Sequence, residues 1–366
     1  MIFYPKAAAI YSLSKSKSQI WWPMQTEEKL PRISVLMPVY NNDRYIVEAV
    51  ESILNQTVTD FEFIIVDDGS TDRTSTILSD YEKRDPRVRV IRQENRGIVT
   101  ALNAGIAFCK ALYIARMDGD DISYPNRFGL QMDYLDNNPD CAVVGGVFMS
   151  IDEDGNRLSP YRFARNRVTS FQTFPIQVAL TVHPLAMIRK QALVAVGGYR
   201  STFPHAEDYE LFLRISEYGR LHNLDEILLS YRNHQQSISR RNIELQETAM
   251  AYAELAAFSA YRNKFDVINP QMDFESARRQ LDSMFPQQLI RAYVEFRIWR
   301  RIGAYDDAAA RARLGNVMLS LLSLDPATLI SYDYWRLRRR IFGRLILNGI
   351  KAIKFDRRVQ LENGHP

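Results

Sequence analysis

Over the first 150 residues, short apolar runs alternate with segments whose apolar residues recur at helical spacing. Within one such segment Ile46, Val50, Ile53 and Leu54 are three or four positions apart, or adjacent, as on one face of a helix. The apolar runs are too short for helices and are bounded by turn-forming residues, which is typical of strands. The pattern predicts strands over residues 33–37, 61–66, 88–91, 112–115 and 141–147, and helices over residues 44–54, from about 72 to 81, 98–108 and 128–135.

The composition of the strand runs indicates how they are covered. Each run is nearly all apolar, as expected when helices lie on both faces of a sheet. Strands and helices that alternate with short loops favour a mostly parallel arrangement. The expected fold class is therefore α/β, with a Rossmann-like, mostly parallel sheet flanked by helices.

Beyond Ser150 the alternation fades, and the chain is expected to change its organisation. A helix is predicted to begin near His205, with Leu211, Phe212 and Ile215 on its buried face, and a short strand over residues 227–231. From Ile243 onward the pattern is helical. We expect an N-terminal extension over residues 1–31, an α/β domain over residues 32–240, and a helical, basic C-terminal region over residues 241–366.

An acidic cluster, Met117-Asp-Gly-Asp-Asp121, follows the predicted fourth strand directly. In open α/β sheets, ligands bind at the edge where the strands end. Clustered carboxylates suit hard divalent ions such as Mg²⁺ and Mn²⁺, which proteins often hold together with a substrate diphosphate. The cluster therefore predicts a metal–diphosphate site. The alternative for an isolated acidic pair is a solvated turn.

Five segments in order resemble the inverting family 2 glycosyltransferases of the GT-A fold, over about residues 32–240. They are Met37-Pro-Val-Tyr-Asn41, Val66-Asp-Asp-Gly-Ser70, Asp118-Gly-Asp-Asp121, His205-Ala-Glu-Asp208 and Tyr231-Arg-Asn-His234. Each segment alone is a weak signal, and their common order and spacing carry the resemblance. It implies the nucleotide-diphospho-sugar transferase form of the α/β sheet.

The resemblance also implies a nucleotide site. Tyr40 would stack on a pyrimidine base and Asp68 would accept its ring N–H, whereas their ordinary roles would be a packed aromatic and a turn aspartate. Many relatives carry an arginine where this chain has Leu102, so Arg96 or Arg116 would have to meet the diphosphate. The implied nucleotide-binding residues are Pro38, Val39, Tyr40, Asn42, Asp68, Asn95, Gly97, Asn103, Arg116 and Asp118.

The same likeness implies a metal and a base. Asp120 would bind Mn²⁺ or Mg²⁺, aided by Asp118 and by His234, and Asp121 would orient the pair or cap the next helix. Asp208 would be the base that takes the acceptor's proton, with Glu207 and His183 binding the acceptor. As alternatives, helix N-terminal acids are common, and a lone histidine is usually structural.

Charge is unevenly distributed along the chain. From Arg291 onward there are 15 Lys/Arg and 7 Asp/Glu, a net charge of +8, so the remainder carries −4 of the +4 total. The basic amphipathic stretch 334–358 has three interpretations: a solvated helix packed on the domain, peripheral docking on an anionic membrane, or an oligomer contact. No nucleic-acid readout motif accompanies it, so nucleic acid is not an expected partner.

Other signals narrow the function class. No run of apolar residues is long enough to span a membrane, and neither a P-loop nor a dinucleotide-binding glycine motif is present. The 2 cysteines form no disulfide framework, which fits a cytoplasmic protein, or one peripheral to the inner face of the cytoplasmic membrane.

We therefore predict a metal-dependent inverting glycosyltransferase in cell-surface polysaccharide synthesis. Its donor would be a nucleotide sugar, for which the likeness favours a UDP-sugar, and its acceptor a hydroxyl of a glycan or lipid-linked carrier. One alternative is a sugar-1-phosphate nucleotidyltransferase, although the loop at residues 38–42 lacks the glycine, arginine and lysine usual there. Another is a non-catalytic glycan- or membrane-binding protein on the same fold.

Overall fold

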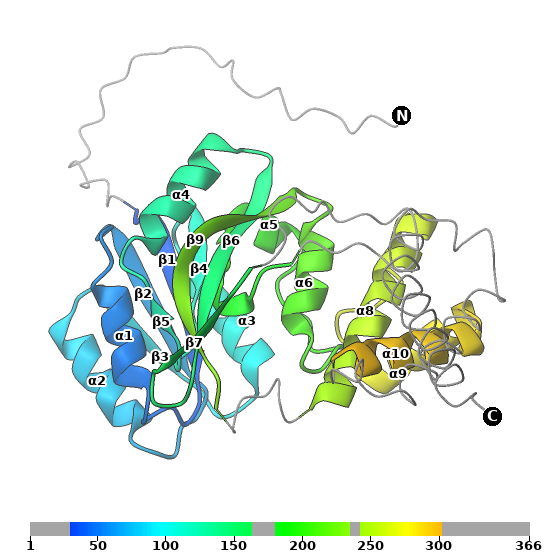
Figure 1. Ribbon diagram of the computed structural model, residues 1–366, viewed down its shortest axis with the longest axis horizontal. Coiled ribbons are helices and arrows are strands. Elements are labelled where there is room, and N and C mark those ends of the chain that lie inside the picture. Colours follow the sequence, from blue (N-terminus) through cyan, green and yellow to red (C-terminus); the bar gives the residue numbers. More distant parts are fainter. Residues whose placement is uncertain (1–29, 163–179, 235–241, 302–366) are drawn as a thin grey trace, which may run out of the picture. The chain divides into compact units, whose positions relative to one another are not determined.

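The computed structural model describes residues 30–162, 180–234 and 242–301 (Figure 1). Its first half confirms the predicted alternation of strands and helices. The predicted helix over residues 98–108 has the observed bounds, and the other predicted ends differ by a few residues. The elements are β1 (Ile33–Val39), α1 (Ile46–Leu54), β2 (Phe61–Asp67), α2 (Thr74–Arg84), β3 (Val88–Arg92), α3 (Ile98–Phe108) and β4 (Tyr113–Arg116).

The second half of the sheet contains two long strands, β6 and β9, among shorter strands and helices. β6 and β9 are both longer than predicted, and β5, β7, β8 and α5 were not predicted. Further along the chain, the structure has β5 (Ile122–Ser123), α4 (Arg127–Asn137), β6 (Cys141–Ile151), β7 (Arg157–Tyr161), η1 (His183–Leu185), β8 (Met187–Arg189), α5 (Lys190–Ala195), α6 (Glu207–Ile215) and β9 (Arg220–Arg232).

Among the described residues, nine strands form one sheet in the order β3-β2-β1-β4-β8-β6-β9-β5, with β7 paired to β6. Strands β1 to β4 are parallel to one another, and β6 is parallel to β9. The antiparallel pairs are β4 with β8, β8 with β6, β5 with β9 and β6 with β7. Parallel strands β1, β2 and β4 bring their carboxyl ends to one edge, where the loops at residues 40, 68 and 118 lie.

Strands of the parallel half are buried on both faces, as their apolar sequence predicts. Ile33, Val35 and Met37 pack with α1 and α4 in one core, whereas Leu36 packs with α3, α5 and α6 in another. Successive side chains of a strand point to opposite faces, so one strand serves both cores. Gly105 of α3 allows that helix to approach β1 closely, because a Cβ there would lie 2.2 Å from Leu36 Cδ1.

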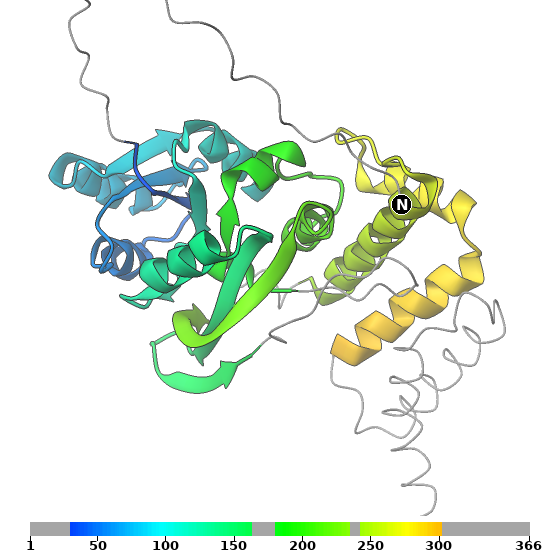
Figure 2. The ribbon, with the colours of Figure 1, turned by 90° about the horizontal axis from the view of Figure 1, so that it is seen from above.

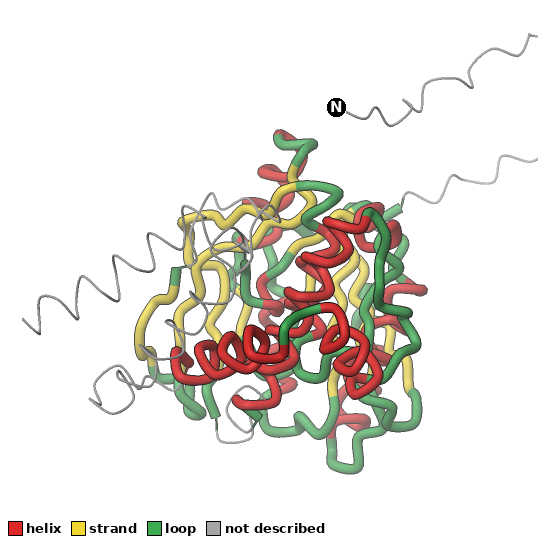
Figure 3. The backbone as a smooth tube through the Cα atoms, turned by 90° about the vertical axis from the view of Figure 1, so that its right-hand side faces the viewer, coloured by secondary structure: helices red, strands yellow, loops and turns green. Residues whose placement is uncertain are grey.

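Three helices follow the sheet: α8 (Ile243–Asn263), α9 (Phe274–Met284) and α10 (Gln287–Arg301). They confirm the predicted helical pattern as far as residue 301. Together with Tyr209 and Leu213 of α6 they form a third apolar core. Helix α6 lies between the sheet and α8 (Figures 1 and 2), and in the side view the three helices lie in front of the strands (Figure 3).

The stretch 334–358 and nearly all of the predicted extension 1–31 lie outside the described residues. Within the residues that are described, no helix has both the length and the apolar character that crossing a membrane requires.

Candidate active site

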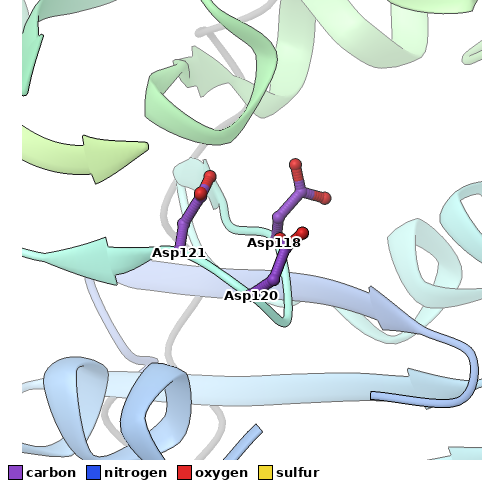
Figure 4. Close-up of side chains that lie close together, drawn as sticks. All are labelled: Asp118, Asp120 and Asp121. Carbon is purple, nitrogen blue, oxygen red and sulfur yellow. The ribbon is translucent and has the colours of Figure 1, made fainter. Parts of the chain in front are cut away.

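The acidic loop, residues 117–121, begins where β4 ends and is held against β1. The Met117 N–H donates to the Leu36 carbonyl at 3.0 Å. At Gly119 a Cβ would lie 2.9 Å from Val39 Cγ1 and 3.3 Å from Asn42 Cγ, so a side chain there would push the loop away. The carboxyl groups of Asp118, Asp120 and Asp121 project to the same side of the loop (Figure 4), each with a ligand atom within 4.8 Å of the others.

Two buried arginines lie beside the acidic loop. Arg116 is 2% exposed and forms an ion pair with Asp118. Arg127 of α4 is fully buried and donates to the Arg116 carbonyl at 2.7 Å. Burial lowers the pKa of Arg127 to about 9, with the charge of Arg116 acting in the same direction and Asp121 opposing it. The loop's negative charge thus has positive partners in the protein interior.

The arginines do not fully compensate the carboxylates. Burial, reinforced by the charges of Asp120 and Asp208 and opposed by Arg116, raises the pKa of Asp118 to about 6. Asp121 is 1% exposed, and burial with its acidic neighbours raises its pKa well above the ordinary range. A crowded set of carboxylates, one buried and two partly exposed, favours either protonation or a bound cation.

Asp121 also bears on the metal interpretation. Its Oδ1 accepts the Arg232 N–H at 2.8 Å, whereas its buried Oδ2 has no hydrogen-bond partner within the described ranges. It caps no helix, because α4 begins six residues later with Asn126 as its N-cap, so that alternative is wrong. An orphaned carboxylate oxygen among two other carboxylates fits a divalent ion, since Mg²⁺ and Mn²⁺ take oxygen ligands.

The end of β9 brings His234 to the acidic loop. His234 Nε2 lies 2.8 Å from Asp120 Oδ2, close to the separation of about 3 Å between adjacent ligands of an octahedral ion. The preceding Arg232 donates its Nε–H to the Asp120 carbonyl at 2.7 Å and pairs with Glu48 at 2.5 Å. Arg232 therefore fixes the backbone of the acidic loop, and β9 carries His234 to it.

The turn after β2 holds the predicted nucleotide residue Asp68, which is 4% exposed. Its Oδ1 accepts from the Gln93 side chain at 2.6 Å and the Arg96 N–H at 2.9 Å, and its Oδ2 accepts the Gly97 N–H at 2.8 Å. Asp68 thereby fixes the loop that precedes α3. Oδ2 has one protein donor among the described residues and retains a lone pair for a further N–H.

The loop after β1 lies beside that turn. Tyr40 is 47% exposed, whereas Pro38 and Val39 are buried and the Val39 carbonyl accepts the Asp68 N–H at 2.9 Å. The carbonyl of Asn42 accepts the first N–H bonds of α1, and the Asn42 N–H donates to Thr74 Oγ1 at 2.8 Å. Tyr40 is therefore an exposed ring on a fixed backbone, which suits stacking on a flat ligand.

The predicted residues of the α3 region have different surroundings. Asn95 and Gly97 are exposed, and Leu102 is fully buried in the core. The Asn103 side chain accepts the Tyr199 N–H and donates to the Tyr199 carbonyl, both at 2.9 Å. Its amide therefore joins α3 to the loop before α6. Arg96 is 66% exposed and Arg116 is buried, so Arg96 is the better placed of the two for a diphosphate.

Helix α6 begins with Glu207 and Asp208, which are both partly exposed. The Tyr209 N–H donates to Asp208 Oδ1 at 2.7 Å. Burial, reinforced by Asp208, raises the pKa of Glu207 to about 7. Burial also raises the pKa of Asp208, with the Tyr209 N–H and Arg116 opposing it. The charge of Asp208 raises the pKa of Asp118, so the two acidic groups lie close enough to interact.

His183 is buried beside Tyr199 and beside Phe212 of α6 rather than exposed to a ligand. Its Nε2 lies 2.7 Å from the Tyr199 hydroxyl, and burial together with Arg116 lowers its pKa well below the ordinary value. His183 is therefore neutral at neutral pH. Through Tyr199 it supports the loop that Asn103 also holds.

Three residues of the site were missed in the sequence. Gln93 fixes Asp68, Tyr199 joins His183 to Asn103, and Arg232 fixes the acidic loop. Arg232 stands inside the Tyr231-Arg-Asn-His234 segment, so its place next to His234 was the available signal. Tyr199 follows Gly197 and Gly198, whose φ angles of 79° and 73° mark a tight turn that glycine favours.

Comparison with known proteins identifies this chain as a glycosyltransferase. A family model described as glycosyl transferase family 2 matches residues 34–197. The O-antigen biosynthesis glycosyltransferase WbnJ of Escherichia coli is 36% identical over 235 residues, which cover 63% of this chain and 88% of that protein. The chain belongs to glycosyl transferase family 2.

Other relatives are much longer than the matched region. The chondroitin synthase of Escherichia coli is 34% identical over 226 residues, 61% of this chain but 32% of that protein. A crystal structure of S. aureus TarS 1-349 in complex with UDP-GlcNAc has a TM-score of 0.52 and 17% identity, covering 81% of this chain and 82% of that one. The predicted GT-A fold is thus confirmed.

Proposed function

We propose that this protein is a metal-dependent inverting glycosyltransferase that moves a sugar from a nucleotide donor to a hydroxyl group. The single observation that carries the proposal is the acidic loop at the end of a parallel strand, where ligand atoms of Asp118, Asp120 and Asp121 lie within 4.8 Å of one another and His234 lies 2.8 Å from Asp120. Asp208 at the start of α6 adds a second acidic group, whose charge contributes to the raised pKa of Asp118. One group suits a cation and a diphosphate, and the other suits proton transfer.

The donor's nucleoside would lie over the loops after β1 and β2. The exposed ring of Tyr40 would stack on the base, and the remaining acceptor capacity of Asp68 Oδ2 would take a ring N–H. Asn95, Gly97 and the backbone of Pro38 to Asn42 would complete the contacts. A UDP-sugar is the donor to test first, because TarS, which shares the fold, has UDP-GlcNAc in its crystal structure.

Mn²⁺ or Mg²⁺ would be held by Asp120 with Asp118, Asp121 and His234. A divalent ion there supplies positive charge beside the departing diphosphate. Arg116 and Arg127 keep the carboxylates in place from the buried side, and the exposed Arg96 would contact the diphosphate where relatives use the residue matching Leu102.

Asp208 would act as the general base. Its carboxylate takes the proton of the acceptor hydroxyl while that oxygen forms a bond to the anomeric carbon. The bond between the anomeric carbon and the diphosphate oxygen breaks on the opposite side, so the configuration inverts and the nucleoside diphosphate leaves. Glu207 would bind the acceptor, and neutral His183 would hold Tyr199 behind it.

The acceptor class comes from the relatives. Names such as O-antigen biosynthesis glycosyltransferase and chondroitin synthase support a role in cell-surface polysaccharide synthesis, with a glycan or a lipid-linked carrier as the acceptor. Membrane docking through residues 334–358 and a cytoplasmic site of action remain predictions of the sequence, since that stretch lies outside the described residues.

The proposal is tested by a donor panel. UDP-, GDP- and dTDP-sugars are added with Mn²⁺, thermal stabilisation is measured, and any stabilising donor is then assayed for transfer to oligosaccharide acceptors. We expect a UDP-sugar to stabilise the protein only with metal and to be turned over. Pyrophosphate release from UTP and a sugar phosphate would instead indicate a nucleotidyltransferase, and binding without any turnover would indicate a non-catalytic protein.

A further inference from the structure

A cluster of buried polar side chains joins helix α6 to helices α8 and α10. Each of these residues is at most 4% exposed. Buried ionised groups are retained only where they are paired and hydrogen-bonded. The buried polar cluster consists of Tyr209 from α6, Glu247 and Glu254 from α8, and Tyr293 and Arg297 from α10.

Glu254 is the centre of the cluster. Its Oε1 accepts a short hydrogen bond from the Tyr209 hydroxyl and pairs with Arg297, and its Oε2 accepts from the Tyr293 hydroxyl at 2.5 Å. The guanidinium of Arg297 also donates its Nε–H to Glu247 at 2.9 Å and lies over the Tyr209 ring at 5.2 Å. Every charged member therefore has a charged partner, and both tyrosine hydroxyls donate.

The cluster bears directly on Asp208. Tyr209 is the next residue, and its N–H donates to Asp208 Oδ1. The cluster thus fixes the side chain of Tyr209, and the backbone N–H of Tyr209 holds the carboxylate of Asp208, the proposed base. A second contact from α8 lies just before the helix, where the Gln246 side chain donates to the His205 carbonyl at 2.8 Å.

The two faces of α6 explain why such a contact is needed. Leu211, Phe212 and Ile215 pack toward the sheet, and Tyr209 and Leu213 pack toward the C-terminal helices. Apolar packing alone tolerates small shifts of a helix along its axis, whereas directed hydrogen bonds fix its position. Displacements of about 1 Å at a reacting group can cost about a hundredfold in rate.

We infer that the buried polar cluster positions Asp208 for proton transfer, so that helices α8 and α10 belong to the catalytic apparatus. This inference rests on the proposed function of Asp208. The residues of the buried polar cluster touch neither donor nor acceptor in this scheme and act only through α6. They are positioning residues rather than catalytic ones.

Tyr209→Phe tests the inference with the smallest change. The ring stays and only the hydroxyl that bonds Glu254 is removed. We expect kcat for transfer to fall about tenfold, while KM for the donor and the Mn²⁺-dependent affinity for UDP stay within about twofold. Arg297→Met should lower kcat further, and Arg297→Lys, which keeps the charge, should recover part of the loss.

Tyr252→Phe is the matched control. Tyr252 is also buried, and its hydroxyl donates to Asp282 of α9 at 2.7 Å, whereas no hydrogen bond joins it to α6 among the described residues. It should lower the melting temperature about as much as Tyr209→Phe and leave kcat unchanged. Unchanged kcat in both variants, assayed below their melting temperatures, would overturn the inference.

A double variant separates positioning from general damage. If Tyr209 acts through Asp208, adding Tyr209→Phe to Asp208→Asn should cause no further loss of kcat. A full additional tenfold loss would contradict the inference. If the unaltered protein transferred no sugar, the proposed function itself would fail. The comparisons between variants test only the positioning role, so the two failures can be told apart.

Discussion

The acidic loop and the start of α6 both carry crowded carboxylates, and the protein compensates them in different ways. The acidic loop has arginines from three elements beside it: Arg116 from β4, Arg127 from α4 and Arg232 from β9. Neither Glu207 nor Asp208 forms an ion pair within the part of the chain that the structure describes. Local positive charge holds the first group, and packing from distant helices holds the second.

This difference assigns different tasks to the two groups. A cation site requires carboxylates that stay in place with and without the ion, and fixed guanidinium groups provide that. A general base benefits from a pKa above that of an ordinary carboxylate, and burial provides it here because Arg116 only partly opposes the effect of burial. The raised pKa of Glu207 and Asp208 follows from the same arrangement.

The largest expected effect is on the acidic loop. Asp120→Ala removes the carboxylate that contacts His234 and, in the proposed scheme, the main metal ligand. We expect transfer to fall by about three orders of magnitude or more, and the gain in UDP affinity on adding Mn²⁺ to disappear. Titration calorimetry of UDP with and without Mn²⁺ measures the second effect. Asp133→Ala, at an exposed position of α4, is the control.

At the start of α6, Asp208→Asn should reduce kcat without changing metal-dependent UDP binding. The amide is nearly isosteric but takes no proton, and loss of a general base typically costs about 10² to 10⁴ in rate. Single-turnover transfer assays with UDP titrations in parallel check both parts. If Asp208→Asn retained full kcat, the base would lie elsewhere, and the start of α6 would no longer be the group that suits proton transfer.

Asn103 tests whether the α3 residue contacts nucleotide or supports the α6 side. Asn103→Ala leaves the Tyr199 N–H and carbonyl without their partner, which should cost about 1–3 kcal/mol of unfolding free energy. Asn103→Asp keeps the acceptor and loses the donor, so a smaller loss is expected. Denaturant unfolding gives both values. A weakened UDP affinity in Asn103→Asp, with unchanged stability, would favour the nucleotide role instead.

The smallest effect concerns the pH dependence of stability at Glu207. Its pKa in the folded protein is about 7, above the ordinary 4.5, so folding favours the protonated form. Stability is therefore lost as pH rises through this window, and the cost is fully present above about pH 7. A shift of this size corresponds to at most about 3 kcal/mol.

Glu207→Gln should remove that cost. Because the side chain is partly exposed, we expect a gain of about 1–2 kcal/mol at pH 8 and almost none near pH 4.5. Urea unfolding at the two pH values measures the difference. An equal gain at both would attribute the effect to packing rather than to charge.

The parallel half of the fold was predictable because its sequence signals are local. Apolar runs such as that of β1 report burial on both faces, and the acidic loop follows its strand directly. The second half of the fold was less predictable. β9 extends over Arg220–Arg232, but the sequence predicts a strand only over residues 227–231, because most of the residues before Ile227 are polar. Arg220 pairs with Asp140 and Asn223 donates to the Leu180 carbonyl, which are contacts that no local pattern reveals.

The candidate site divides in the same way. Each acidic residue was identified by its place after a strand or at a helix start. The sequence also predicted Leu211, Phe212 and Ile215 as the buried face of α6, but not Tyr209 or Leu213, because the opposite face is covered by helices that follow later in the chain. Partners 45 and 88 positions away, as Glu254 and Arg297 are from Tyr209, leave no periodic signal.

Helix α6, with both of its faces covered, limits how such enzymes can be recombined. A hybrid with a related transferase whose junction fell between α6 and α8 would combine one parent's Tyr209 with the other's Glu254 and Arg297. A junction between β8 and α6 would transfer the helix and its supporting helices as one exchangeable module. Attempts to graft a new acceptor preference onto this scaffold should therefore exchange residues from about 200 onward together.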